Sequence, residues 1–282
     1  MGIANKILAC LLVLFGIGLT GCPPHQETTK KEPSLPQDDT IKLIVGFVEQ
    51  LAPDKAKAGI ESAQNIIERR INALGLKEPR IQRYGNDQLQ IQLPGVAEGE
   101  VKRIKEILTT SGNLELKLQA EKSIREVYTK PPDAPPGYSW LTPKPAKEGE
   151  HAPDSVLVND TPVLTGTHIV KATWSYSQHL GNIVEIQLNR EGTAILAETS
   201  EKYSEEDGDP RQLAIILDGK LYSAPIIQSK ITDGKPIISN GHTPGGLPAD
   251  EARDLAMILS SGSLPYPMEI KKEITYTKPT GK

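Results

Sequence analysis

The sequence predicts an α+β fold, and three stretches near the beginning of the chain support this prediction. Residues 41–48 form a short apolar run of the length and composition of a buried strand. Residues 54–74 repeat apolar side chains every three or four positions, as an amphipathic helix does, and Gly75 follows where a left-handed helix end is expected. In residues 88–93 leucine and isoleucine alternate with glutamine, which indicates a strand with one buried face.

The same region extends into a unit of six elements. The glycine, asparagine and aspartate at 85–87 separate two strand-like stretches and predict a hairpin. A second amphipathic helix is expected at residues 101–112, and residues 114–118 alternate as a further strand. The order strand, helix, strand, strand, helix, strand is that of the split βαβ, ferredoxin-like (βαββαβ) arrangement. We therefore expect residues 114–118 to complete the sheet of a ferredoxin-like base.

A second α+β unit is predicted after a proline-rich connection. Residues 121–160 show no sustained period and are interpreted as an extended excursion. From about Pro162 the strand and helix periods resume, with a hairpin across Asp218-Gly219. Pro225 places the second strand of that hairpin at a sheet edge or a bulge, because proline has no N–H to donate. The expected elements of this half are strands at 183–188, 213–217, 221–227 and 268–276, and helices at 191–202 and 249–261.

The N-terminus has the pattern of a lipoprotein export signal. Lys6 precedes an apolar stretch at residues 7–19, and small residues lead to Cys22. At about 1.5 Å per residue this stretch covers about 20 Å, less than the roughly 30 Å of a hydrocarbon core. The resemblance to bacterial lipoprotein signals implies cleavage between Gly21 and Cys22, a diacylglyceryl thioether on the Cys22 sulfur and an acyl group on the new amino terminus. The alternative is an ordinary secretory signal followed by a stray thiol.

A tether is expected between this lipid and the folded part. Residues 23–40 contain four prolines and almost no apolar side chains, the composition of an unfolded segment. As a coil it has an end-to-end distance of roughly 20–25 Å, and fully stretched it reaches about 60 Å. Residues 1–21 are thus the expected signal peptide and residues 22–40 the expected lipidated tether.

The composition argues against several classes of function. A formal net charge of -4 gives no support to binding of nucleic acid. The five histidines show no metal-ligand spacing, and the acidic turn at 205–209 does not follow a calcium loop. No serine lies in a G-x-S-x-G frame, and Cys22 is the only cysteine outside the signal. We therefore expect no catalytic residue, no metal, no cofactor and no enzymatic activity.

Six short segments occur along the chain in the order of a known family. They are IERRINALG at 67–75, QLPGV at 92–96, KEIL at 105–108, PVLTG at 162–166, LAIILDGKLYSAPII at 213–227 and EARDLAMILSSGSLPYP at 251–267. Together they resemble the first large periplasmic domain, P1, of SecD, an accessory subunit of the bacterial Sec protein-export machine. The resemblance implies a base at residues 41–120 that is completed by 248–282, a connection at 121–163, and an inserted α+β head at 164–247.

In that family the domain meets exported chains as they emerge, and its head moves relative to the base. A site for unfolded chains needs exposed apolar surface and free strand edges. Leu221, Tyr222, Pro225 and Ile227, on the presumed edge strand of the head, are the candidate polypeptide-binding residues. The alternative is that they fill the core of the head. The pair Arg69-Arg70, inside the first expected helix, is interpreted as a solvated face or as packing of the family type.

The expected departure from the family concerns the membrane. SecD proteins continue past a segment like residues 273–281 into membrane helices, which act with SecF in using the proton gradient, whereas this sequence stops at Lys282. We therefore expect no proton coupling here. The expected partners are unfolded exported polypeptides, the membrane through the lipid on Cys22, and SecF, SecY or a full-length SecD.

The expected location is the cell envelope, facing the periplasm. Pro23, directly after Cys22, permits sorting to the outer membrane, whereas a partnership with the Sec complex favours the inner membrane. The alternative function is that of a structural or assembly lipoprotein that uses the same fold to bind one folded partner.

Overall fold

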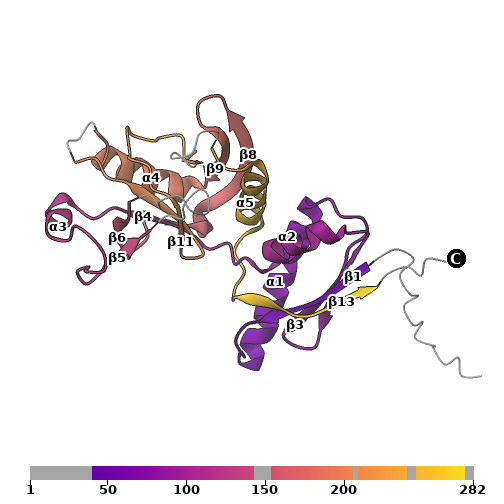
Figure 1. Ribbon diagram of the computed structural model, residues 1–282. Coiled ribbons are helices and arrows are strands. Elements are labelled where there is room, and N and C mark those ends of the chain that lie inside the picture. Colours follow the sequence, from indigo (N-terminus) through magenta and orange to yellow (C-terminus); the bar gives the residue numbers. More distant parts are fainter. Residues whose placement is uncertain (1–39, 143–153, 206–208, 240–245, 277–282) are drawn as a thin grey trace, which may run out of the picture. The chain divides into compact units, whose positions relative to one another are not determined.

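The computed structural model describes residues 40–142, 154–205, 209–239 and 246–276 (Figure 1). Helices and antiparallel sheets are both present in these residues, so the predicted α+β fold is confirmed. The expected signal at 1–21 and nearly all of the expected tether at 22–40 lie outside the described residues.

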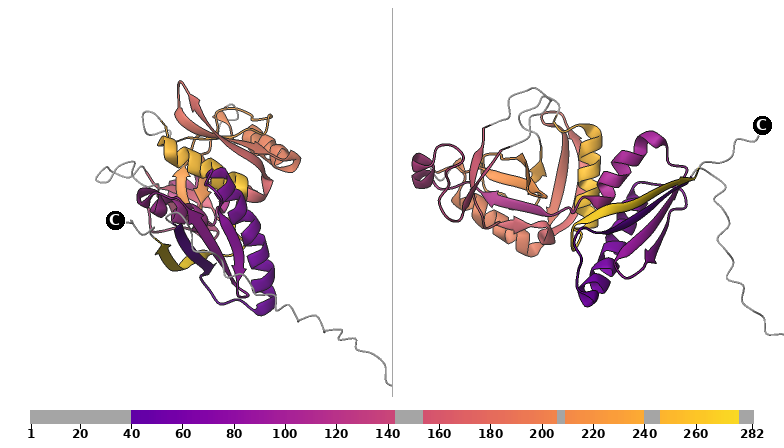
Figure 2. Two further views of the ribbon diagram at one scale, coloured as in Figure 1. Left: turned by 90° about the vertical axis from the view of Figure 1, so that its right-hand side faces the viewer. Right: turned by 60° about the horizontal axis from the view of Figure 1, so that its bottom comes forward.

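The base is a four-stranded antiparallel sheet with the strand order β13-β1-β3-β2. Its elements are β1 (Thr40–Phe47), α1 (Pro53–Ala73), β2 (Arg80–Tyr84), β3 (Gln88–Pro94), α2 (Glu98–Thr109) and β13 (Met268–Tyr276). β3 lies between β1 and β2, and β1 lies between β3 and β13, which is the split βαβ arrangement of a ferredoxin-like fold. Both helices pack on one face of this sheet (Figure 2).

Local sequence explains how α1 covers the sheet. Pro53 occupies the first turn, where its fixed φ and missing N–H cost nothing, and Gly75 follows the helix at a φ of 67°. The predicted apolar stripe is buried: Ile67 is fully enclosed and belongs to the same cluster as Leu43 of β1 and Ile91 of β3. Burial of this stripe, rather than helix propensity, holds α1 in place.

The strand at residues 114–118 does not complete the base sheet, so that expectation is wrong. β4 (Leu114–Leu118) pairs with β10 (Leu213–Leu217) and β7 (Leu164–Thr165) in a different sheet, and β13 takes the sixth position of the base. Alternating leucines show that one face of β4 is buried, but they do not specify which sheet the strand joins. The three leucines of β4 are buried in the core of the head and not in the core of the base.

The helix expected at 249–261 forms as α5 (Ala249–Ser261), but it does not complete the base as expected. Its buried side chains Ala252, Leu255 and Leu259 belong to the core of the head. Ser260 also contributes a hydroxyl that donates to the Ala172 carbonyl at 2.8 Å and accepts from the Ala172 N–H at 2.9 Å. Of the C-terminal segment, only β13 pairs in the base sheet.

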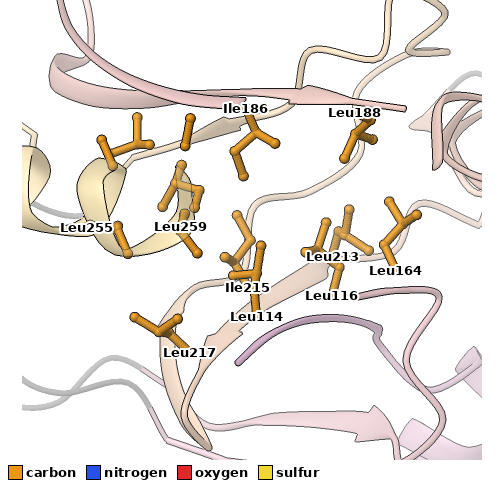
Figure 3. Close-up of a cluster of buried hydrophobic side chains, with 14 of the residues drawn as sticks. Leu114, Leu116, Leu164, Ile186, Leu188, Leu213, Ile215, Leu217, Leu255 and Leu259 are labelled. Atoms are coloured by element: carbon orange, nitrogen blue, oxygen red, sulfur yellow. The ribbon is translucent and has the colours of Figure 1, made fainter. Parts of the chain in front are cut away.

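The core of the head lies between two sheets and is closed on one side by α5 (Figure 3). One sheet has the order β11-β10-β4-β7 and the other β12-β9-β8. The remaining elements here are β8 (Ile169–Ser177), β9 (Gly181–Leu188), α4 (Arg190–Lys202), β11 (Lys220–Ser223) and β12 (Ile237–Ile238). Figure 3 shows Ile186 and Leu188 facing the leucine and isoleucine side chains of β4 and β10.

The connection expected to be an extended excursion contains regular structure instead. It forms α3 (Lys122–Val127), β5 (Tyr138–Leu141) and β6 (Val156–Asn159), and β5 and β6 pair as a hairpin. Val156 and Val158 pack on Ala214 and Ile216, on the face of β10 that points away from the main head core. β10 is therefore buried on both faces, which is why its sequence LAIIL is continuous rather than alternating.

Candidate functional site

The candidate polypeptide-binding residues lie at a sheet edge, but they do not form one open surface. β11 is the terminal strand of its sheet, and a register shift between Ile215 and Ile216 lies opposite it. Leu221 is 5% exposed and packs under the β5–β6 hairpin, whereas Ile227 is 5% exposed and belongs to the main head core. These two side chains therefore fill cores of the head.

Tyr222 and Pro225 are the two candidates that reach the surface. Tyr222 is half-buried against the main core, and burial, followed by the negative charges of Glu251 and Asp218, raises the pKa of its hydroxyl to about 12. It therefore stays neutral at physiological pH and presents a hydroxyl beside an apolar ring. Pro225 is exposed.

Ile226 is an exposed apolar residue beside the four candidates. The Leu213 N–H donates to the Pro225 carbonyl at 2.9 Å, and the Ile227 N–H donates to the Arg211 carbonyl at 3.0 Å. These two bonds extend the ladder of β10 beyond β11, and Ile226 is left 50% exposed between them. Ile226 points away from the core that its buried neighbour Ile227 enters, because successive side chains of an extended segment alternate.

The tip of the β8–β9 hairpin carries a second exposed apolar pair. Tyr176 is 69% exposed and Leu180 is 42% exposed. The Ser177 hydroxyl accepts from the N–H groups of His179 and Leu180 at 3.3 Å, which holds the turn between them. No periodic signal in the sequence marks these residues, because the turn interrupts the alternation of the strands.

The chain crosses between the base and the head twice, at residues 110–113 and at residues 262–267. Arg70 of α1 forms hydrogen bonds to both crossings. Its side chain is fully buried, and it makes five hydrogen bonds. The guanidinium donates to the carbonyls of Ile107, Thr110, Ser111 and Gly262 and to the Ser261 hydroxyl. Burial lowers the pKa of Arg70 to about 10, so the group is still charged at neutral pH. Of the two alternatives for this pair, packing applies to Arg70 and the solvated face applies only to Arg69, which is exposed.

The two crossings also bond directly to each other. The Leu264 N–H donates to the Ser111 carbonyl at 2.8 Å, and the Ser263 hydroxyl donates to the Gly112 carbonyl at 2.7 Å. Gly112 has a φ of 78°, and a Cβ there would lie 2.9 Å from Ile258 Cγ2, so this position requires glycine. The direct bonds between the two crossings and the hydrogen bonds of Arg70 thus form one polar junction between the base and the head.

A second link at this junction is an ion pair between helices. Arg103 of α2 forms a two-point contact with Asp254 of α5, with nitrogen–oxygen distances of 2.9 and 2.7 Å. The hydrogen bonds to Asp254 raise the pKa of Arg103. Bidentate geometry of this kind fixes orientation as well as charge.

Gly21 and Cys22 lie outside the described residues, so lipid attachment stays a prediction. Among the described residues, no group of three or more His, Cys, Asp or Glu side chains is arranged to hold a metal ion. No helix in the same ranges is both long and apolar enough to cross a membrane.

Two family models match most of the folded part of the chain. The model for the SecDF P1 head subdomain covers residues 142–266, and the model for the N-terminal part of the P1 domain of protein translocase subunit SecDF covers residues 60–121. The chain is 32% identical over 237 residues to protein translocase subunit SecD of Magnetococcus marinus, covering 83% of this chain and 42% of that relative. It is 36% identical over 248 residues to the SecD of Aquifex aeolicus, covering 84% of this chain and 43% of that relative.

The chain carries the P1 region of the SecD family. It spans less than half the length of these two SecD relatives. A crystal structure of SecDF in a super-membrane-facing form matches 86% of this chain and 32% of that chain, with a TM-score of 0.63 and 24% identity. A structure of SecDF, described as a membrane component that enhances protein export, matches 82% of this chain and 98% of that chain, with a TM-score of 0.57 and 25% identity. The chain thus shares the fold of these SecDF structures.

Proposed function

We propose that this protein takes part in Sec-dependent protein export, where its P1 head contacts polypeptides that emerge from the membrane. The observation that carries the proposal is the match to SecD over more than four fifths of the chain. In this proposal the protein is held by a lipid on Cys22, draws no energy from the proton gradient itself and has no enzymatic activity. Export is driven by other components.

The head offers chemistry suited to such contacts. Ile226 and Pro225 lie exposed beside the edge strand β11, and Tyr176 and Leu180 lie exposed at the β8–β9 tip. Unfolded chains present apolar side chains and backbone hydrogen-bond groups without a fixed sequence. Scattered apolar side chains near a strand edge can bind them weakly and without strict selectivity, which a transient contact requires.

Photo-crosslinking in cells tests the contact. Probes replace Ile226 and Tyr176 one at a time, and a control probe replaces Asn72, an exposed residue of α1 in the base. The proposal expects many exported proteins as adducts of the two head probes, and their loss when export is blocked. One dominant folded partner, captured equally when export is blocked, would contradict it and favour the structural lipoprotein.

Lipid attachment has its own test. Cells that express the full chain are fed a labelled fatty acid, and the protein is isolated from the membrane fraction. Incorporation of label that is lost in Cys22→Ala supports the anchor. An unlabelled wild-type protein would contradict it without affecting the crosslinking result.

A further inference from the structure

The sheet of the base has one covered and one open face. Side chains of alternate residues, among them Leu43 and Ile91, pack under α1 and α2. The residues between them point to the other face, because successive side chains of a strand alternate. We call this the open face and define it by Lys42, Arg80, Gln82, Gln92 and Lys272. The same side also carries Tyr84, Ile274, Glu269 and Lys271, whereas Ile44 and Gln90 are buried within it. Most of its exposed side chains are polar or charged, whereas the covered face is apolar.

Strand register places three cations across the full width of the open face. Lys42 of β1 pairs with Gln92 of β3, and Gln92 pairs with Arg80 of β2. In the next row, Lys272 of β13 pairs with Ile44 of β1. At about 4.8 Å between neighbouring strands, the cations on β13 and β2 are roughly 14 Å apart.

These three cations have no ion-pair partner within the described ranges, whereas two cations on the helix side of the sheet do. Arg83 pairs with Glu61 and Lys105 with Glu273, both on the helix side of the sheet. The carboxylate of the open face, Glu269, is paired with Lys271. The open face is therefore positive in a protein whose formal charge is -4.

We propose that the open face of the base binds the anionic phospholipid headgroups of the membrane to which the chain is tethered. Lysine, arginine and glutamine side chains supply N–H donors for phosphate oxygens. β1 begins at Thr40, directly after the predicted tether, and a stretched tether reaches at most about 60 Å. This step rests on the proposed lipid anchor, which would raise the effective concentration of headgroups at the face.

The test uses the expected mature chain, residues 22–282, with Cys22→Ser. This variant cannot carry the lipid, so any membrane binding that is measured comes from the protein surface. Its partition onto vesicles of phosphatidylglycerol and phosphatidylcholine is measured by co-sedimentation, with pure phosphatidylcholine as the reference. Each Lys or Arg near an anionic surface contributes about fivefold, so removing three costs on the order of 100-fold in partition. The variant is Lys42→Gln with Arg80→Gln and Lys272→Gln.

A matched control keeps the net charge change but moves it to α1 and its C-terminal loop. Lys55→Gln, Lys57→Gln and Lys77→Gln remove three exposed cations outside the open face. We expect binding to anionic vesicles that the first variant loses, that the control largely retains and that higher salt weakens. Circular dichroism and a thermal melt confirm that both variants are folded.

Equal loss in both variants would show general charge attraction and overturn the proposal. Absence of wild-type binding to anionic vesicles would also overturn it, and crosslinks from Lys272 to an acidic protein in cells would then assign the face to a protein partner. Neither result bears on contact of the head with exported chains.

Discussion

Replacing Arg70 by methionine should destabilise the protein by at least about 3 kcal/mol, because the polar junction would lose its common donor. Methionine keeps helix propensity and much of the buried volume. Two of the five acceptors keep another partner, since the Ser261 hydroxyl still bonds to Ile258 and the Ser111 carbonyl to Leu264. Three carbonyls then lose their Arg70 donor, at a cost of about 1–3 kcal/mol each when no water replaces it. Those carbonyls belong to Ile107, Thr110 and Gly262.

Urea unfolding followed by far-UV circular dichroism measures the change, and Arg69→Met is the matched control. Arg69 is the exposed neighbour on the same helix, and its substitution should alter the free energy of unfolding by no more than about 0.5 kcal/mol. Arg70→Lys should fall between the two, because an ammonium keeps the charge but offers only three donors. A free energy for Arg70→Met within about 1 kcal/mol of wild type would refute the assignment of the junction to Arg70.

Three further predictions concern single positions. Gly112→Ala should destabilise by about 1–3 kcal/mol in the same unfolding assay, because it combines a positive φ with a close approach to Ile258; an unchanged midpoint would contradict this. Leu221→Ala should lower the free energy of unfolding by about 2–4 kcal/mol, whereas Ile226→Ala should leave it unchanged and reduce only the crosslinking of exported chains to the Tyr176 probe. The reverse order of costs would show the burial assignments to be wrong. Because the pKa of Tyr222 is raised in the folded state, the unfolded state ionises first, and the resulting contribution to the free energy of unfolding is complete below pH 10 and is lost as the pH rises toward 12. Tyr222→Phe should flatten this decline of the free energy with pH in a series of unfolding curves. An identical slope would argue against burial of the hydroxyl.

Periodicity in the sequence predicted the elements of the base well but not their partners. The helical stripe of α1 and the alternation of β3 depend on nearest neighbours along the chain, so they can be read locally. The sheet to which β4 belongs depends on β10, about a hundred residues later, and nothing within residues 114–118 encodes that choice. The structure of residues 121–160 was missed because its strands are short and separated by prolines.

The candidate site was predicted only in part for a related reason. A strand-edge position followed correctly from Pro225, but the buried and exposed members of residues 221–227 depend on what covers each face of β10. The sequence left packing of Arg70 as one of two alternatives and could not decide for it, since a charged residue in an amphipathic helix normally faces water. Its acceptors are carbonyls from segments distant in the sequence, and such acceptors leave no compositional signal.

The position of β13 has a consequence for the order in which the chain folds. Thr40 pairs with Tyr276, so the sheet of the base closes only when nearly the whole folded chain is present. Until then one edge of β1 has unpaired N–H and C=O groups, which is the hazard that edge strands pose. The head contains its own core and can form between α2 and β13 first, shortening the effective loop that β1 and β13 must close. When such a chain crosses a membrane from its N-terminus, β1 therefore emerges long before β13, its partner strand.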